Sequence, residues 1–168
     1  MDIIEKARVF ATAAHAAAAQ LRKYTNEPYI VHPTEVAGII ANLEGATTEM
    51  VAAAWLHDVV EDTGVTIEII RAEFGEKVAE LVGWLTDVSR PEQGNRATRK
   101  AIDRAHTAMA PADAQTVKLA DLMSNCRSIV EHDATFAKVY FEEKRLLMEV
   151  LTKGDRELWD IVQAIVAK

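Results

Sequence analysis

Residues 51–62 read VAAAWLHDVVED, an apolar run followed by His57, Asp58, Glu61 and Asp62. A helix that buries the apolar run carries these ionisable side chains toward its interior face. Residues four apart on a helix share a face, so His57 is expected over Glu61 if the helix continues that far. Asp58 is expected over Asp62 for the same reason. Without compensation such carboxylates raise one another's pKa, and a divalent cation removes that cost. The competing interpretation is an acidic helix end facing solvent, with His57 as a capping or packing residue.

Apolar side chains recur at three- and four-residue spacing along most of the chain, which predicts helices. The chain has 168 residues, 49% of them apolar, with only 7 Gly and 4 Pro, which disfavours a strand-and-turn architecture. Helices are expected at residues 4 to about 22, 33–43, from 47 or 48 toward a break at Gly64, after Thr66 as far as 74, 76–85, 96–109, 111–130, 135–152 and 155–167, with a loop at 87–95. We therefore predict a compact all-α fold in a single domain, residues 1–168.

Charge and cysteine content argue against several classes of protein. Lys and Arg total 19 against 26 Asp and Glu, a net charge of −7, so no nucleic-acid partner is expected. The one cysteine, Cys126, allows no internal disulfide, has no evident partner that would make it a nucleophile, and fits a cytoplasmic location. No apolar run of about 18 residues predicts a membrane span, and the N-terminus lacks the order of a signal peptide. An apolar stripe at 158–165 completes the core or joins copies in a homo-oligomer.

Two residues elsewhere in the chain match the chemistry of His57 and Asp58. His32 lies at a predicted loop-to-helix junction, and Asp121 ends the stretch VKLAD. Two imidazoles and two carboxylates suit octahedral manganese or iron(II), with water in the open positions. A tetrahedral structural zinc site would more often use thiolates. Asn125 lies four residues after Asp121 on the same helical face, where it binds a substrate hydroxyl or a metal-bound water, or is satisfied by its helix neighbours.

Six motifs follow one another along the chain. They are RK (22–23), PYIVHP (28–33), LHDVVEDT (56–63), FG (74–75), LTD (85–87) and VKLAD (117–121). In this order they resemble the hydrolase domain of RelA/SpoT proteins, within the HD phosphohydrolase superfamily, and especially the free-standing small alarmone hydrolases. The resemblance extends from about residue 13 to residue 151. It implies an enzyme with Mn²⁺ as cofactor that removes the 3′-pyrophosphate from guanosine tetra- and pentaphosphate.

The resemblance also implies roles by position. The metal ligands would be His32, His57, Asp58 and Asp121, the catalytic acidic pair Glu61 and Asp62, and the substrate-binding residues Arg22, Lys23, Asn125 and Tyr140. One member of the acidic pair would deprotonate the attacking water, and the same pair could protonate the departing 3′ oxygen. Arg22 and Lys23 would offset the negative charge of the substrate, or else lie at a solvated helix C-terminus.

Some features leave alternatives open. The stretch after Asn125 diverges from the family, so adenosine alarmones or other nucleotides stay as alternative substrates. A non-catalytic module that binds alarmone is a further alternative, although every expected metal ligand is present. The synthetase and regulatory segments of the long RelA/SpoT proteins have no counterpart in these residues, so hydrolysis without synthesis is expected. The cluster of Arg96, Arg99, Lys100 and Arg104 is a solvated helix face or a shield for the outer phosphates of the substrate.

Overall fold

The computed structural model describes residues 1–168, and helices make up its regular structure. There is no strand, and the only β contact is an isolated antiparallel bridge between Leu21 and Pro28. None of the helices has the length and apolar character needed to cross a bilayer. The chain forms two compact units, residues 1–86 and 87–168. The predicted all-α class is confirmed.

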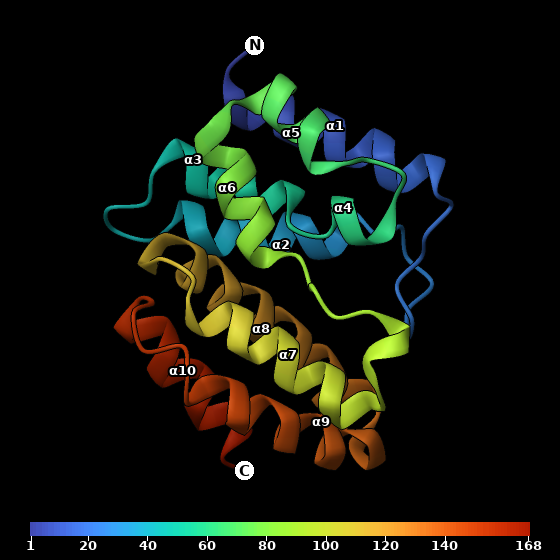
Figure 1. Ribbon diagram of the computed structural model, residues 1–168, viewed down its shortest axis with the longest axis vertical. Helices are drawn as coiled ribbons and strands as arrows, with labels where there is room; N and C mark the ends of the chain where they lie inside the picture. Colours follow the sequence, from blue (N-terminus) through green and yellow to red (C-terminus); the bar gives the residue numbers. More distant parts are fainter. The chain divides into compact units, whose positions relative to one another are not determined.

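The first unit consists of six helices, coloured from blue to green in Figure 1. They are α1 (Ile3–Ala17), α2 (Val31–Ala41), α3 (Thr48–Leu56), α4 (Val59–Asp62), α5 (Ile67–Phe74) and α6 (Glu76–Leu85). α3 packs against α1, α2 and α6, and every residue from 50 to 56 is buried. Thr47 caps α3 by accepting a hydrogen bond from the backbone N–H of Met50 at 3.2 Å, at one of the two positions where the sequence predicts this helix to begin. The buried α3 thereby carries the residue that follows it, His57, into the interior of this unit.

The first helix ends earlier than its periodicity predicts, at Ala17 and not near Arg22. Ala19 has a φ of +51°, in the left-handed region. The backbone N–H groups of residues 19 and 20 donate to carbonyls three and five positions earlier, at 3.0 and 3.3 Å, which is the pairing of a Schellman motif. Gly or Asn normally occupies the left-handed position, so an alanine gives no sequence signal for this helix end. Arg22 and Lys23 therefore lie in the loop after α1 and not at a helix C-terminus.

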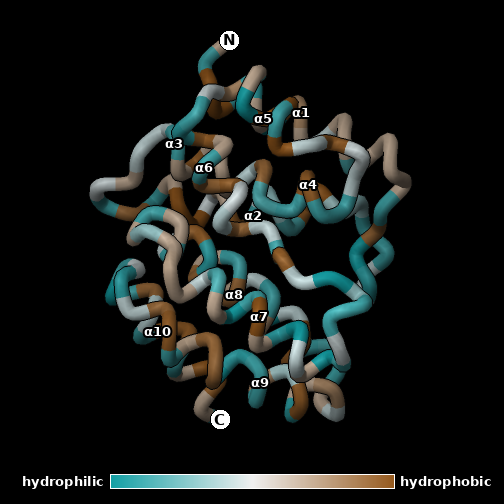
Figure 2. The backbone as a smooth tube through the Cα atoms, in the orientation of Figure 1, coloured by the Kyte–Doolittle hydropathy of each residue, from teal (hydrophilic) through white to brown (hydrophobic).

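The second unit is organised around α8, its longest helix. Its elements are a 3₁₀ turn (Pro91–Gln93), α7 (Arg96–Ala108), α8 (Ala112–His132), α9 (Ala134–Met148) and α10 (Arg156–Val166). α8 packs against α9 and α10, and α7 packs against α9. Figure 2 shows hydrophobic and hydrophilic residues alternating along α10, whose apolar face buries Leu158 and Val162. The predicted limits of these four helices differ from the observed ones by at most four residues.

A buried glutamine fixes the position of α8 within the second unit. The side-chain amide of Gln115 donates to the carbonyl oxygens of Thr107 and Val150 at 3.1 and 3.2 Å. Its oxygen accepts from the backbone N–H of Lys153 at 2.9 Å. These bonds join α8 to the ends of α7 and α9, so the next turns of α8, which include Asp121, sit on a rigid support.

Candidate metal centre and active site

Three of the predicted metal ligands lie together in the first unit. His32 is in the first turn of α2, and His57 and Asp58 are the two residues between α3 and α4. His32 Nε2 lies 3.2 Å from His57 Nε2. Asp58 Oδ2 lies 3.0 Å from His57 Nε2 and 3.6 Å from His32 Nε2. Both imidazoles are buried and Asp58 is half-buried, so the three side chains form a group that could hold a metal ion.

The hydrogen bond on the far side of the His57 ring defines its tautomer. His57 Nδ1 lies 2.7 Å from the carbonyl oxygen of Ala54, which can only accept, so Nδ1 carries a proton. In the neutral ring, Nε2 then carries a lone pair, which can accept a hydrogen bond from His32 Nε2. The same lone pair faces the Asp58 carboxylate oxygen, and this contact is repulsive by itself. A cation among the three atoms removes this repulsion. An imidazole whose other nitrogen donates to a backbone carbonyl is the usual arrangement of a metal-bound histidine, so the residues fit a divalent metal.

The helix does not continue through His57 and Asp58, contrary to the expectation from the sequence. α3 ends at Leu56, and a separate short helix, α4, begins at Val59. The backbone N–H of Asp62 still donates to the carbonyl of Asp58 at 3.0 Å, so these two residues remain one turn apart. Of the acidic pair, Asp62 is half-buried, whereas Glu61 is exposed.

The carboxyl group of Asp62 lies in a polar network that begins in α1. Gln20 hydrogen-bonds the Asp62 side chain, and the Gln20 oxygen lies 3.0 Å from His15 Nδ1. Burial raises the pKa of Asp62, and the charge of Asp58 adds to this rise, whereas Gln20 opposes it. Burial lowers the pKa of His15, and its Nε2 atom is buried without a hydrogen-bond partner. Asp62 therefore holds a proton more readily than a surface aspartate does.

Tyr29 joins the loop after α1 to the metal-ligand cluster. Its hydroxyl donates to Asp58 Oδ2 at 2.6 Å. Its ring packs against the His15 ring with centroids 4.9 Å apart, and the Arg22 guanidinium lies 5.8 Å from the centre of the Tyr29 ring. Arg22 is thus brought near the cluster through Tyr29, whereas Lys23 is exposed and lies over the ring of Tyr24.

Tyr29, Gln20 and His15 received no catalytic or binding role from the sequence. Tyr29 belongs to the motif PYIVHP, but its contact joins residues 29 positions apart, which periodicity does not reveal. His15 and Gln20 meet because the helix ends between them at Ala17, and that end has no glycine to mark it. The spacing of His15 and Gln20, both polar in an alanine-rich stretch, is the one signal that could have indicated them.

The remaining predicted ligand, Asp121, lies in α8 of the second unit. It is buried, and its carboxylate accepts hydrogen bonds from Lys118 Nζ and Asn125 Nδ2, both at 2.9 Å. The Asn125 amide is thus satisfied by its helix neighbour, one of the two roles expected for it. Asp121 and Asn125 share the helix face that their four-residue spacing predicts.

Tyr140 is a buried residue of α9. It contacts Cys126 of α8 through a side-chain hydrogen bond, and burial raises the pKa of the Tyr140 hydroxyl well above its usual range. Burial also raises the pKa of the Cys126 thiol to about 11. Both groups are therefore neutral at physiological pH, and each has the other as a hydrogen-bond partner.

Comparisons with known proteins cover most of the chain. A family model described as HD domain matches residues 7–146. The chain is 42% identical over 130 residues to the probable GTP pyrophosphokinase of Mycobacterium leprae, covering 77% of this chain and 16% of that protein. It is 40% identical over 130 residues to the probable guanosine-3′,5′-bis(diphosphate) 3′-pyrophosphohydrolase of Synechocystis, covering 76% and 17%. The chain therefore spans about a sixth of the length of these relatives.

A solved structure is similar over nearly the whole chain. It is described as a metazoan ortholog of SpoT that hydrolyzes ppGpp and plays a role in starvation responses. The TM-score is 0.85 at 26% sequence identity, over 98% of this chain and 94% of that one. The aligned region includes residues of both compact units.

Proposed function

The chain belongs to the HD domain family, in its RelA/SpoT hydrolase type, and from that premise we propose that it hydrolyses guanosine tetra- and pentaphosphate. Water attacks the phosphorus that is attached to the 3′ oxygen, the bond between that phosphorus and the 3′ oxygen breaks, and GDP or GTP and inorganic pyrophosphate leave. The observation on which this proposal rests is the convergence of His32, His57 and Asp58 in a chain with those relatives. The small-molecule nucleotide is the proposed partner.

Manganese(II) is the ion that we propose for this site, with His32, His57, Asp58 and Asp121 as its protein ligands. Support comes from the donor set, because two imidazoles with two carboxylates suit an octahedral ion of this kind. When bound, such an ion neutralises phosphate oxygens and lowers the pKa of water. The hydrogen bonds to Ala54 and Tyr29 hold His57 and Asp58 in orientation for this role.

Glu61 and Asp62 are the proposed acid–base pair, and Asp62 is the better placed to accept a proton. Its burial and raised pKa bring it closer to the pH at which proton transfer in both directions is efficient. Gln20 keeps the Asp62 carboxyl group in one orientation. Glu61, which is exposed, would exchange its proton with solvent.

Four residues are proposed to contact the nucleotide. Arg22 and Lys23 offset phosphate charge, since guanidinium and ammonium groups form charge-assisted hydrogen bonds with phosphate oxygens. Asn125 and Tyr140 would contact the sugar or the base.

We further propose that both compact units together form one hydrolase domain, because the family match at residues 7–146 includes parts of each. A cytoplasmic location is proposed from the free, buried thiol of Cys126.

The test is release of pyrophosphate from ppGpp and, in parallel, ppApp, with manganese and with chelator. We expect turnover of ppGpp that requires manganese. Asp58→Asn removes a ligand charge and is expected to lower kcat/KM by about a thousandfold or more. Glu44→Gln removes an exposed carboxylate of the same unit and is the matched control.

Three other results of this assay would each change or contradict one part of the proposal. Turnover of ppApp alone would keep the reaction and change the base specificity. Turnover that persists in chelator would contradict the metal assignment. Alarmone binding without turnover, in protein that contains manganese, would contradict hydrolysis and favour a non-catalytic binding module.

A further inference from the structure

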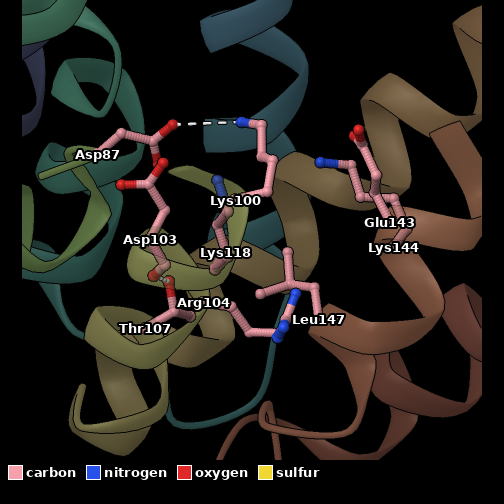
Figure 3. Close-up of a pocket in the computed structure, with 9 residues that line it drawn as sticks. All are labelled: Asp87, Lys100, Asp103, Arg104, Thr107, Lys118, Glu143, Lys144 and Leu147. Atoms are coloured by element: carbon pink, nitrogen blue, oxygen red, sulfur yellow. Dashed lines mark hydrogen bonds and ion pairs between the residues drawn. The ribbon is translucent and has the colours of Figure 1, made fainter. Parts of the chain in front are cut away.

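A pocket of about 60 Å³ in the second unit is lined by a cluster of cationic side chains. They are Lys100 and Arg104 of α7, Lys118 of α8 and Lys144 of α9 (Figure 3). The volume is several times the roughly 10–15 Å³ that one water molecule requires. The chain has a net charge of −7, so this local concentration of positive charge opposes the overall balance.

Two of the three carboxylates that line the same pocket are engaged with partners outside the cationic cluster. Asp103 accepts hydrogen bonds from two backbone N–H groups and a serine hydroxyl, at 2.8–2.9 Å. Glu143 forms a two-bond ion pair with Arg96, at 2.6 and 2.9 Å. Asp87 forms an ion pair with Lys100, with the two charged atoms 3.5 Å apart. These acids therefore leave part of the positive charge uncompensated.

Two of the cations form no direct ion pair. Lys144 makes no hydrogen bond or ion pair, and its ammonium group lies 4.7 Å from the centre of the Tyr140 ring. Figure 3 shows this group pointing toward the side of the pocket where Lys100 and Lys118 lie. Burial, with the charges of Lys118 and Lys100, lowers the pKa of Lys144 to about 8, and the carboxylates of Asp121 and Glu143 only partly offset this effect. Arg104 also makes no hydrogen bond or ion pair. Such half-buried, like-charged groups are costly unless an anion joins them.

We propose that this pocket binds a phosphate-bearing anion, with Lys144 and Lys100 as its main contacts. Lysine ammonium groups bind phosphate oxygens as point charges with several donors each. The pyrophosphate group is the chemistry that fits, and it occurs both as free inorganic pyrophosphate and at the 5′ end of a nucleoside diphosphate. Lys118, which also binds Asp121, places the pocket beside one of the proposed metal ligands. The site itself stands on the charge arrangement and does not require that the chain hydrolyse anything.

The test is calorimetric titration of the whole chain with inorganic pyrophosphate, in chelator and at low ionic strength. Lys144→Met keeps an apolar stem over Tyr140 and removes the charge. We expect its affinity to fall about tenfold or more, the size expected for one lost charge-assisted hydrogen bond. Lys144→Arg is expected to retain binding. Lys138→Met, which removes an exposed lysine of the same helix, is the control and is expected to bind as the parent chain does.

Two results would overturn the proposal: no binding of pyrophosphate or GDP by the parent chain, or equal affinity in the parent and in Lys144→Met. Lys144→Met is expected to melt no lower than the parent in the absence of anion, because it removes like-charge repulsion; melting therefore separates lost binding from lost folding. Asp58→Asn is expected to bind pyrophosphate normally in chelator, so this test is independent of the proposed hydrolysis.

Competition distinguishes the two sources of the pyrophosphate group. Displacement of inorganic pyrophosphate by GDP, lost in Lys144→Met, would support a pocket for the 5′ end of a nucleotide. Binding of pyrophosphate that GDP does not displace would support a pocket for the free anion. In either case the affinity must depend on Lys144.

Discussion

The carboxyl group of Asp62 shows how a residue outside the sequence motifs influences one inside them. Gln20 donates a hydrogen bond that favours the charged form of Asp62, against the effect of burial. Gln20→Leu removes this donor, so the pKa of Asp62 is expected to rise further. A base must be ionised to accept a proton, and the acidic limb of the kcat/KM profile should therefore move to higher pH. The measurement is the rate of pyrophosphate release between about pH 5 and pH 9.

A control in the other unit accompanies this variant. Gln163→Leu removes a half-buried glutamine of α10 and is expected to leave the profile unchanged. A Gln20→Leu profile that superimposes on that of the parent chain would contradict the positioning role of Gln20.

The Cys126 thiol is expected to be unreactive in the native chain. Its pKa of about 11 leaves roughly a thousandth of the thiol ionised at pH 8, and the side chain is buried. Iodoacetamide at pH 8 is expected to leave the native chain unlabelled over a time in which the urea-unfolded chain is labelled fully. Mass spectrometry provides the readout, and stoichiometric labelling of the native chain would show that the thiol is accessible and activated.

Some contacts of the site residues can be predicted from the sequence, and others depend on how the chain folds. The convergence of His57 and Asp58 with His32 follows from motifs in the chain, and the four-residue spacing of Asp121 and Asn125 predicts their hydrogen bond. The contact of Tyr29 with Asp58 depends on how the loop before α2 meets the end of α3, and no pattern in the sequence encodes it. Burial, which shifts the pKa of Asp62, is likewise a property of the folded chain.

At the scale of elements, the helix types and most helix limits follow from apolar spacing and capping residues. Thr47, Thr66, Asn95 and Asp155 each cap a helix by accepting a backbone hydrogen bond at 2.9–3.4 Å. The break at His57 and Asp58 was not predicted, because the apolar pattern continues through Val59 and Val60. That break separates Glu61 from the buried face that the continuous helix would have given it.

The end of α1 provides a test of the element that positions His15 and Gln20. The left-handed conformation of Ala19 is unfavourable by roughly 1–2 kcal/mol. Glycine adopts this conformation without strain, but it raises the conformational entropy of the unfolded chain, which costs about 0.4–1 kcal/mol. Ala19→Gly is therefore expected to stabilise the chain by up to about 1 kcal/mol. Ala13→Gly, at an exposed position inside α1, is expected to destabilise it by about 1 kcal/mol. Urea unfolding measures both, and equal destabilisation by the two variants would contradict a helix end at Ala17.

At the scale of the whole molecule, metal binding and folding are expected to be linked. An ion that binds the native chain and not the unfolded one stabilises it by about 2.7 kcal/mol at a concentration 100 times the Kd. Manganese is therefore expected to raise the melting temperature of the parent chain, and chelator to reverse the effect. Asp58→Asn should lose this response while melting near the parent chain in chelator. A response of equal size in Asp58→Asn would place the ion elsewhere.

The proposed site residues are divided between the two compact units. The family match and the similarity to a solved hydrolase extend over residues of both units. Asp121, Asn125 and Tyr140 belong to the second unit, and the other proposed site residues belong to the first. The proposed enzyme requires residues from each, so its activity is a property of the whole chain and not of either unit.

The most direct test of the central claim is to locate the bond that breaks. The measurement is ³¹P NMR and mass spectrometry of the products formed from ppGpp in ¹⁸O-labelled water with manganese. We predict one labelled oxygen in each released pyrophosphate and none in the GDP, because the water attacks phosphorus and the 3′ oxygen stays with the nucleoside. Label in the 3′ hydroxyl of GDP, or release of orthophosphate in place of pyrophosphate, would contradict the proposed 3′-pyrophosphohydrolase reaction.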